Sequence, residues 1–326
     1  MCLRNLCLFA MVSFAAQAQQ DAWTEAMSQG RSLQNQGRFR EAVELFQSAL
    51  QEAERLPRSP ARQAAALYQL ATVNADLGSL EKAARLSARA ASILTKTVGA
   101  DDPLLQIVRT ELAELLINSR QLSTAEGLLK QIIAAQARAS QTASLPGARA
   151  LDDLACVYAA QKKRAAAEKL ERQALSFLET LQGSGELSLA IVSLHLAMVL
   201  DSTKRPAEAL PYAERAAGVL KRLPESHPYL EAEAAMSLAS LYVVVGRRNE
   251  AEPQARKAVD LVERVYGPDH PYTAWMWIGR AAVLRRLDRK SEAAAAQKQG
   301  QRILTERGQR DRLGDTVPFN ALVPFR

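Results

Sequence analysis

The amino-acid sequence predicts an all-α solenoid of about seven helical hairpins, because three features recur in one register. A turn position recurs at spacings of 41 and then 42 residues. Alanine stands five residues after each turn position, and glycine or alanine stands seven residues before it. The turn positions are Gly37, Gly78, Arg120, Lys162, Lys204, Gly246 and Asp288. A single hairpin cannot bury its apolar face alone, so a run of such units predicts neighbours stacked in a row.

The clearest hairpin lies between residues 236 and 271. Leu238, Leu241 and Tyr242 share one face at i, i+3, i+4 spacing, which predicts a helix. Gly246 ends this helix, and Ala251 belongs to a second one that follows a short polar turn. Alanine lets two helices approach closely, so we expect Ala251 to be buried where they meet. No alternating apolar run bounded by hairpin turns indicates a strand.

These small residues resemble the tetratricopeptide repeat. The first unit matches best, and the residues that fill its motif are Gly30, Gly37, Phe39, Ala42, Phe46 and Ala49. The period of 42 exceeds the usual 34, and together with the links ADDP, SHP and GPDHP it resembles the kinesin light chain variety, which also occurs in bacterial proteins. Ile132 and Gly300 depart from the alanine expected late in each unit. The resemblance covers about residues 21–306 and implies a right-handed superhelix with a concave groove lined by each unit's first helix.

The expected solenoid spans residues 19–306. Its repeats lie near 23–56, 64–97, 106–139, 148–181, 190–222, 232–266 and 274–306. The last predicted helix is polar, as a terminal cap should be. Residues 307–326 lack a helical period, and we expect a flexible C-terminal tail there. The two Val-Pro-Phe segments at its end are either a short docking motif or simply part of the tail.

Residues 1–18 have the pattern of a signal peptide. Arg4 precedes an apolar run from Leu6 to Ala16, and Ala16-Gln17-Ala18 is a small-x-small cleavage site. The run is too short to span a bilayer, and the alternative is a buried N-terminal helix. We therefore expect an exported protein, periplasmic or secreted, that begins near Gln19 and has no transmembrane segment after signal removal.

The net charge of +7 is concentrated at the C-terminal end, since ten Lys/Arg and five Asp/Glu fall within residues 285–326. A solvated terminal face explains this cluster, and attraction to an acidic partner or an anionic membrane is the alternative. A nucleic-acid partner is not expected, because the sequence lacks a basic stripe interleaved with aromatic residues.

Chemistry-bearing residues are sparse, and we expect no catalytic, cofactor-binding or metal residues. Cys156 is interpreted as a small buried hydrophobe, since no nearby sequence feature suggests a histidine partner. His195 is interpreted as a core or groove histidine, whereas His227 and His270 precede proline at expected helix starts. The three histidines belong to three different units, which argues against a metal site. Phosphate loops, nucleophile elbows and zinc-protease motifs are absent from the sequence.

The resemblance implies a non-enzymatic module that binds a peptide or protein in the groove. The groove residues that it implies are Arg31, Asn35, Tyr68, Asp76, Asn118, Met198, Met236, Val243, Trp275 and Ile278, with Leu194 and Val244 beside them. This groove is polar in its N-terminal half and apolar in its C-terminal half, so we expect a peptide with an apolar anchor near Met236, Val243 and Trp275. The alternatives are a structural part of an envelope or secretion assembly and, least favoured, a hydrolase with an unrecognised site. The oligomeric state stays open.

Overall fold

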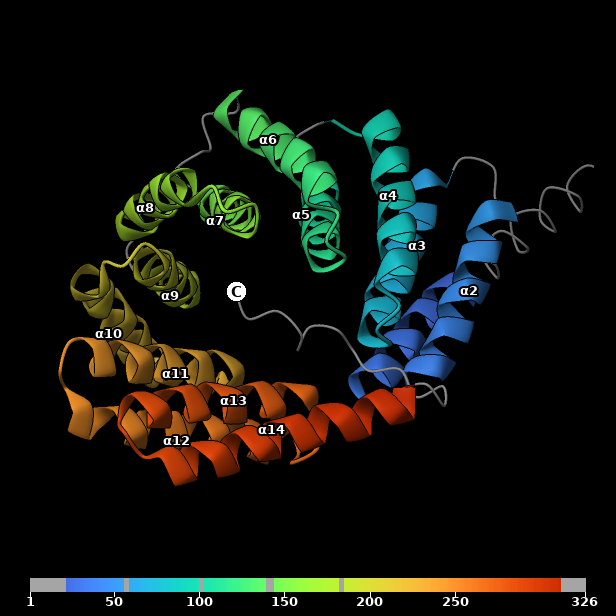
Figure 1. Ribbon diagram of the computed structural model, residues 1–326. Coiled ribbons are helices and arrows are strands. Elements are labelled where there is room, and N and C mark those ends of the chain that lie inside the picture. Colours follow the sequence, from blue (N-terminus) through green and yellow to red (C-terminus); the bar gives the residue numbers. More distant parts are fainter. Residues whose placement is uncertain (1–21, 56–58, 100–101, 139–143, 182–184, 312–326) are drawn as a thin grey trace, which may run out of the picture. The chain divides into compact units, whose positions relative to one another are not determined.

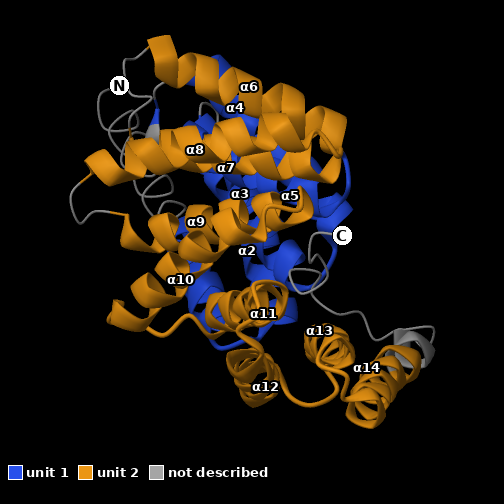
Figure 2. Ribbon diagram, turned by 60° about the vertical axis from the view of Figure 1, so that its left-hand side comes forward, with its two compact units in different colours: residues 1–121, 317–319 blue, residues 122–316, 320–326 orange. Residues whose placement is uncertain are grey.

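The computed structural model describes residues 22–55, 59–99, 102–138, 144–181 and 185–311, and every regular element in these ranges is a helix (Figure 1). The described residues up to Gln121 form one compact unit, and those from Leu122 onward form a second (Figure 2). The expected signal peptide at 1–18 and the tail from 312 onward lie outside the described residues.

Unit 1 is a succession of antiparallel helices. A helix over 22–35 is followed by α2 (Phe39–Arg55), α3 (Pro60–Asp76), α4 (Leu80–Thr97) and α5 (Pro103–Asn118). Met27 of the first helix packs with Phe46 and Ala49 of α2 in one buried cluster. Leu105 and Val108 of α5 share a second buried cluster with residues of α3 and α4. Each helix is therefore held by its neighbours along the chain.

Unit 2 repeats this arrangement. Helix α6 (Leu122–Arg138) precedes four hairpins: α7 (Leu145–Ala160) with α8 (Arg164–Thr180), α9 (Glu186–Ser202) with α10 (Pro206–Arg222), α11 (Pro228–Val244) with α12 (Arg248–Tyr266), and α13 (Pro271–Arg286) with α14 (Lys290–Asp311). Consecutive helices pack on one another, and the first helices also contact each other, α7 with α9, α9 with α11 and α11 with α13. The predicted all-α fold of stacked hairpins is confirmed within each unit.

The turns inside the hairpins share one backbone conformation. All seven turn positions identified in the sequence have positive φ, between 61° and 88°. At the α9–α10 turn, the N–H of Lys204 donates to Asp201 (2.9 Å) and the N–H of Arg205 donates to Leu200 (3.0 Å), which satisfies the last carbonyls of α9. Gly37, Gly78 and Gly246 adopt this conformation without steric cost, whereas the non-glycine turns each carry about 1–2 kcal/mol of strain.

The periodic small residues are the closest contacts between helices. All seven alanines that follow the turns are at most 1% exposed, Ala251 among them, and the small residues before the turns are buried too. A Cβ on Gly30 would lie 2.5 Å from the Phe46 ring, so glycine makes room for the larger side chain. Gly300 is equally restricted, because its Cβ would lie 2.7 Å from the carbonyl oxygen of Ala274. The periodic small residues therefore mark the positions at which neighbouring helices touch.

Helix boundaries extend beyond the repeat bounds expected from the sequence. Helices α5, α7, α9, α11 and α13 begin three or four residues earlier, in most cases with proline in the first turn, where its missing N–H is not needed. His227 and His270 are the N-cap residues of α11 and α13, and His270 Nδ1 accepts a hydrogen bond from the N–H of Tyr272. At the other end, α14 continues to Asp311, five residues past the expected solenoid.

A charged contact recurs between successive hairpins of unit 2. A glutamate on a second helix pairs with a basic residue one turn later and with another just after the next hairpin turn. The sets are Glu126, Lys130 and Lys163; Glu168, Arg172 and Arg205; and Glu252, Arg256 and Arg289. Lys130 and Gln161 lower the pKa of Glu126 to about 2, and the Arg pairs lower the pKa of Glu168 and Glu252 against the effect of burial. These contacts link neighbouring hairpins.

Candidate functional site

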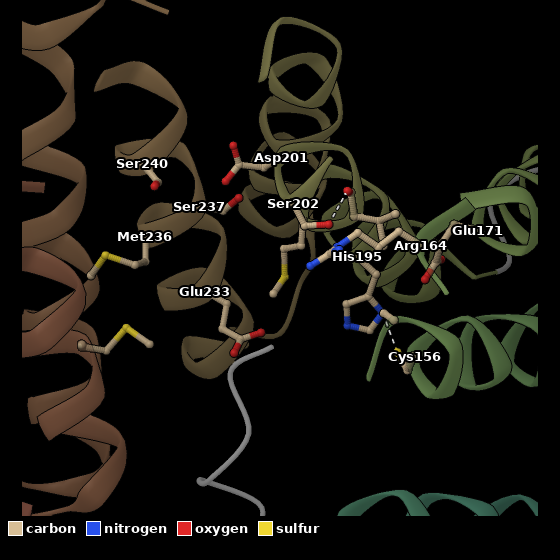
Figure 3. A pocket seen from close by; sticks show the side chains of 14 residues that line it. Cys156, Arg164, Glu171, His195, Asp201, Ser202, Glu233, Met236, Ser237 and Ser240 are labelled. Atoms are coloured by element: carbon tan, nitrogen blue, oxygen red, sulfur yellow. Dashed lines mark hydrogen bonds between the residues drawn. The ribbon is translucent and has the colours of Figure 1, made fainter. Parts of the chain in front are cut away.

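Unit 2 contains a cavity of about 340 Å³ whose wall is formed by α7, α8, α9, α11 and α13 (Figure 3). Its apolar part includes Met198, Met236 and Met276. Its polar part includes the side chains of Cys156, Arg164, Glu171, His195, Asp201 and Glu233 and three serines. A volume of this size lies within the range of about 300–1,000 Å³ that is typical of ligand pockets.

The cavity is a product of the repeat. Cys156, Met198 and Ser240 stand six residues before successive turn positions, 42 residues apart, and all three line the cavity. Because α7, α9 and α11 pack side by side, equivalent residues on these helices reach the same space. The resemblance implied a groove along the first helices, and these lining residues fall on the positions it assigns to that groove.

The position of Met236 depends on the absence of a side chain at Gly279 of the next helix, α13. A Cβ on Gly279 of α13 would lie 2.9 Å from the sulfur of Met236, closer than such contacts allow. Glycine at 279 therefore leaves space for the methionine between α11 and α13. The half-buried thioether is flexible and polarizable, which suits the wall of an adaptable binding site.

Two carboxyl groups in the wall are poorly solvated. Burial raises the pKa of Glu233, and this effect outweighs the opposing influence of His195 and of the Tyr229 hydroxyl, which donates to Glu233 Oε1 at 3.0 Å. Burial also raises the pKa of Asp201 against the influence of Arg286. Burial therefore disfavours the ionised form of both carboxyl groups.

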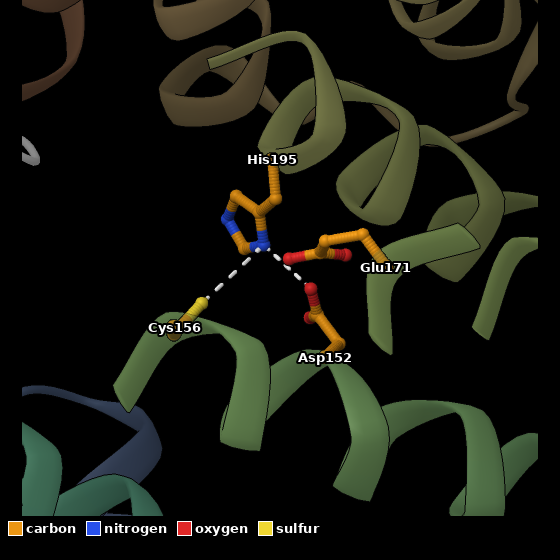
Figure 4. A group of neighbouring side chains, drawn as sticks. All are labelled: Asp152, Cys156, Glu171 and His195. Atoms are coloured by element: carbon orange, nitrogen blue, oxygen red, sulfur yellow. Dashed lines mark hydrogen bonds and ion pairs between the residues drawn. The ribbon is translucent and has the colours of Figure 1, made fainter. Parts of the chain in front are cut away.

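One end of the cavity adjoins a group of four side chains from three helices, which we call the α7–α9 cluster (Figure 4). Asp152 and Cys156 lie one turn apart on α7, Glu171 comes from α8 and His195 from α9. His195 Nδ1 lies 2.7 Å from Asp152 Oδ1 and 3.6 Å from Cys156 Sγ. One ligand-type atom from each of the four residues lies within 4.8 Å of the other three.

Burial and neighbouring charge shift the protonation of the cluster. Burial alone would lower the pKa of His195, but the Asp152 carboxylate, with help from Glu233 and Asp153, raises it to about 9. Burial and then Asp152 raise the pKa of the Cys156 thiol well above its usual value. The same two causes raise the pKa of Glu171 well above its usual range. The imidazolium of His195 and the thiol of Cys156 are thus favoured at neutral pH, and burial disfavours the ionised form of Glu171.

The grouping of Cys156, His195 and Asp152 is not the geometry of a nucleophilic triad. In a triad, one imidazole nitrogen faces the nucleophile and the other faces the carboxylate. Here the same atom, Nδ1, contacts both Sγ and Oδ1. A reactive thiol also needs a lowered pKa, whereas burial raises that of Cys156. The arrangement suits holding a proton or a cation rather than attacking a substrate.

The structure brings together only some of the residues that the sequence assigns to the groove. Met198 and Met236 both line the cavity. Val243 packs against the core of unit 2, and Trp275 and Ile278 are half-buried on α13 without forming part of the described cavity wall. The assignment of Leu194 to the groove is wrong. Its side chain is 1% exposed and packs among apolar residues of α9, α10 and α11.

The predicted groove residues of unit 1 form polar contacts of their own. Tyr68 donates its hydroxyl hydrogen to Glu111 Oε1 at 3.1 Å, and Asp76 Oδ2 accepts from Gln34 Nε2 at 2.7 Å. Arg31 and Asn35 are exposed on the helix over 22–35, and Asn118 is half-buried at the end of α5. These first helices are thus linked by polar side chains, in keeping with the polar N-terminal half expected from the sequence.

Sequence reasoning missed the α7–α9 cluster. It assigned Cys156 no histidine partner, and this is wrong, because His195 lies 3.6 Å from the thiol sulfur. The 42-residue period of the sequence contained a signal that these residues lie close together. His195 is 42 residues after Asp153, so it occupies on α9 the place next to the one equivalent to Asp152 on α7. Counting histidines alone does not reveal the cluster, because its other ligand-type residues are Asp152, Cys156 and Glu171.

Comparisons with known proteins agree with this architecture. Family models of the tetratricopeptide repeat match residues 30–56 and 148–184, and a further one matches residues 230–306. None of the curated proteins matches the chain by sequence. Among the described residues, no helix has the length and apolarity required to cross a membrane.

Solved structures with a similar fold include BtubC (BKLC) from P. vanneervenii, with 20% identity, a TM-score of 0.60 and coverage of 70% of this chain and 92% of that chain. The apo form of RapI shares 11% identity with a TM-score of 0.66, covering 87% of this chain and 99% of its own. The Rap conjugation gene regulator of plasmid pLS20, in complex with the Phr* peptide, shares 12% identity with a TM-score of 0.64. The match covers 96% of this chain and 80% of that chain. At these identities the likeness concerns the fold.

Proposed function

Because the chain is built of tetratricopeptide repeats, we propose that it is a protein-interaction module that binds a peptide segment of another protein at the cavity of unit 2. The observation that carries this proposal is that the cavity wall is formed by equivalent positions of successive repeats. Equivalent positions on α7, α9 and α11 line one continuous space of about 340 Å³. The structurally similar Rap regulator, which was solved with the Phr* peptide, supports a peptide as the class of ligand.

The wall favours an apolar anchor on the peptide. Met198, Met236 and Met276 supply flexible apolar surface that adapts to aliphatic and aromatic side chains. Ser202, Ser237 and Ser240 offer hydroxyl groups that donate to or accept from a peptide backbone. The anchor expected from the sequence near Met236 is retained, whereas Trp275 and Val243 lie outside the wall.

The proposed module works without catalysis. The cavity holds one histidine, and the geometry at His195 directs a single ring nitrogen to both the thiol and the carboxylate. The raised pKa of Cys156 disfavours the thiolate that a cysteine nucleophile requires. Binding is therefore the activity that these side chains support best.

A selection experiment tests the proposal. Peptides are selected from a displayed random library on the full chain, and the affinity of the synthetic peptides is measured by fluorescence anisotropy. Met198→Lys places a charge in the apolar wall and should weaken binding at least tenfold, or about 1.4 kcal/mol. Val265→Lys on the exposed face of α12 is the matched control and should leave affinity unchanged. Peptides that bind Met198→Lys as tightly as the parent would exclude this cavity.

We also propose that the protein is exported, on the basis of Arg4, the apolar run Leu6–Ala16 and the small-x-small site at Ala16-Gln17-Ala18. Mass spectrometry of the N-terminal peptide from the native cell tests this. A mature chain that begins near Gln19 is expected, and a cytoplasmic chain that retains residues 1–18 would overturn it.

A further inference from the structure

We propose that the α7–α9 cluster is a binding site for one divalent transition-metal ion, with Zn²⁺ as the best fit, held by Asp152, Cys156, Glu171 and His195. Thiolate sulfur, imidazole nitrogen and carboxylate oxygen are the ligand types that zinc uses in proteins, and four of them make a complete tetrahedral set. A thiolate also separates this set from the oxygen-only ligands that Mg²⁺ and Ca²⁺ prefer.

The helices place these ligands without help from an ion. Residues four apart on a helix share a face, so Asp152 and Cys156 project together from α7. Helices α8 and α9 pack against each other, and α7 packs against both, which brings Glu171 and His195 to the same point. Figure 4 shows the side chains converging from three directions.

The distances are close to those of a tetrahedral site. Zinc–sulfur bonds of about 2.3 Å and zinc–nitrogen or zinc–oxygen bonds of about 2.0–2.2 Å place neighbouring ligand atoms roughly 3.3–3.7 Å apart. The 3.6 Å between Cys156 Sγ and His195 Nδ1 already falls in this range. The 2.7 Å contact between His195 Nδ1 and Asp152 Oδ1 must open by about 1 Å, and the widest separation, at most 4.8 Å, must close by a similar amount. We expect side-chain rotations to supply both changes.

A second observation points independently to a ligand. Glu171 is 1% exposed, and its Oε2 atom is buried without a hydrogen-bond partner among the described residues. A buried carboxyl oxygen without a partner is costly, and native structures seldom keep one without a reason. An ion bound between Glu171 and the other three side chains would satisfy it.

An ion can reach the site. Cys156, Glu171 and His195 all line the cavity, so the cluster opens to that space on one side (Figure 3). The equivalent positions one repeat later are held by residues that cannot form such a site, Leu194, Met198, Ala213 and Ser237. The next junction of the repeats therefore lacks such a site.

Metal titration of the purified full chain tests the proposal. Cys2→Ser and Cys7→Ser are introduced first, so that Cys156 is the single thiol. After dialysis against a chelator, Co²⁺ is added and absorption is followed in the sulfur-to-cobalt charge-transfer and ligand-field regions. We expect one equivalent of Co²⁺ in a tetrahedral spectrum, displacement by Zn²⁺, and a higher melting temperature with Zn²⁺. Failure to bind one equivalent overturns the proposal, whatever the variants do.

Variants identify the ligands. Cys156→Ser should abolish the charge-transfer band, and Glu171→Gln and His195→Gln should each weaken binding at least tenfold. Glu252→Gln and His227→Gln are matched controls, because Glu252 is a buried glutamate paired with Arg280 and His227 stands at the N-cap position of α11. Both controls should bind Co²⁺ as the parent does. Circular dichroism checks that each variant is folded, and a folded Glu171→Gln that binds unchanged would remove Glu171 from the site.

Discussion

Repeats four and five place the same backbone positions together but fill them with different chemistry. At the junction that follows repeat four, the positions hold Asp152, Cys156, Glu171 and His195. One period of 42 residues later, the equivalent positions hold Leu194, Met198, Ala213 and Ser237. Leu194 and Ala213 are at most 1% exposed and belong to the apolar core, and Glu171 is buried to the same degree.

This difference separates the properties that the repeat scaffold determines, burial and contact, from the chemistry that the side chains determine. The period fixes which positions are buried and which ones meet, since equivalent residues have similar exposure in both repeats. One period later, the apolar residues Leu194, Met198 and Ala213 serve three of these positions, so the fold has no need of ionisable ones there. Burying a carboxyl group and an imidazole costs free energy unless their partners compensate, which is why a ligand at the cluster explains their presence.

The largest effect should come from breaking what the two repeats share. Ala167→Asp and Ala209→Asp each put a charge into a dry helix contact, where the alanine is 0% exposed. Both variants should lose about 3 kcal/mol or more of unfolding free energy, and to a similar extent. Chemical denaturation measures this, and hydrogen exchange should show that opening begins in unit 2. A large loss at one alanine only would contradict a common scaffold.

A smaller but selective effect is expected from His195→Leu. The change leaves Asp152 buried without its charged partner, and the expected cost is about 3 kcal/mol in metal-free protein. Ser237→Ala at the equivalent position is the control and should change stability by less than about 0.5 kcal/mol. Adding Asp152→Leu to His195→Leu should recover most of the loss. No recovery would mean that His195 stabilises the unit by packing alone.

Exchanging the whole set sharpens the comparison further. A variant with Asp152→Leu, Cys156→Met, Glu171→Ala and His195→Ser carries, at each position of the cluster, the residue found 42 positions later. We expect the metal-free variant to gain about 2 kcal/mol over the metal-free parent, because apolar groups replace buried ionisable ones. Thermal unfolding with and without Zn²⁺ tests this: the ion should stabilise the parent only. A variant less stable than the metal-free parent would show that the cluster supports the fold by itself.

The smallest effect concerns the turns, which differ little between the two repeats. Lys162 and Lys204 both have a φ of 62°, a conformation that costs residues with a Cβ. Lys162→Gly and Lys204→Gly should each stabilise the protein by about 0.5–1 kcal/mol after the added flexibility of glycine in the unfolded chain is counted. Gly246→Lys should lose a similar amount. Equal melting temperatures for Gly246→Lys and the parent would show that the turns are unstrained.

The sequence predicted the positions that the period controls. All seven turn positions and the alanines after them were found from spacing alone, because a fixed backbone turn and a close helix contact tolerate few residue types. Leu194 was misplaced, since the position pattern does not show how far α10 and α11 cover α9. The cluster was missed because Glu171 comes from a second helix, and the period does not say how its side chain crosses to α7 and α9.

The tight turns have a practical consequence for engineering. Each turn closes with hydrogen bonds across a few residues, as at Lys204 and Arg205, so added chain length there would separate two packed helices. The described link between α10 and α11, residues 223–227, has no such pair of backbone hydrogen bonds. Glu225, in the link between α10 and α11, is exposed and lies outside both helices. An epitope or a fluorophore inserted at Glu225 should leave both hairpins intact, whereas the same insertion at Lys204 should split one. Reporter sites for the cavity can therefore be chosen in the links.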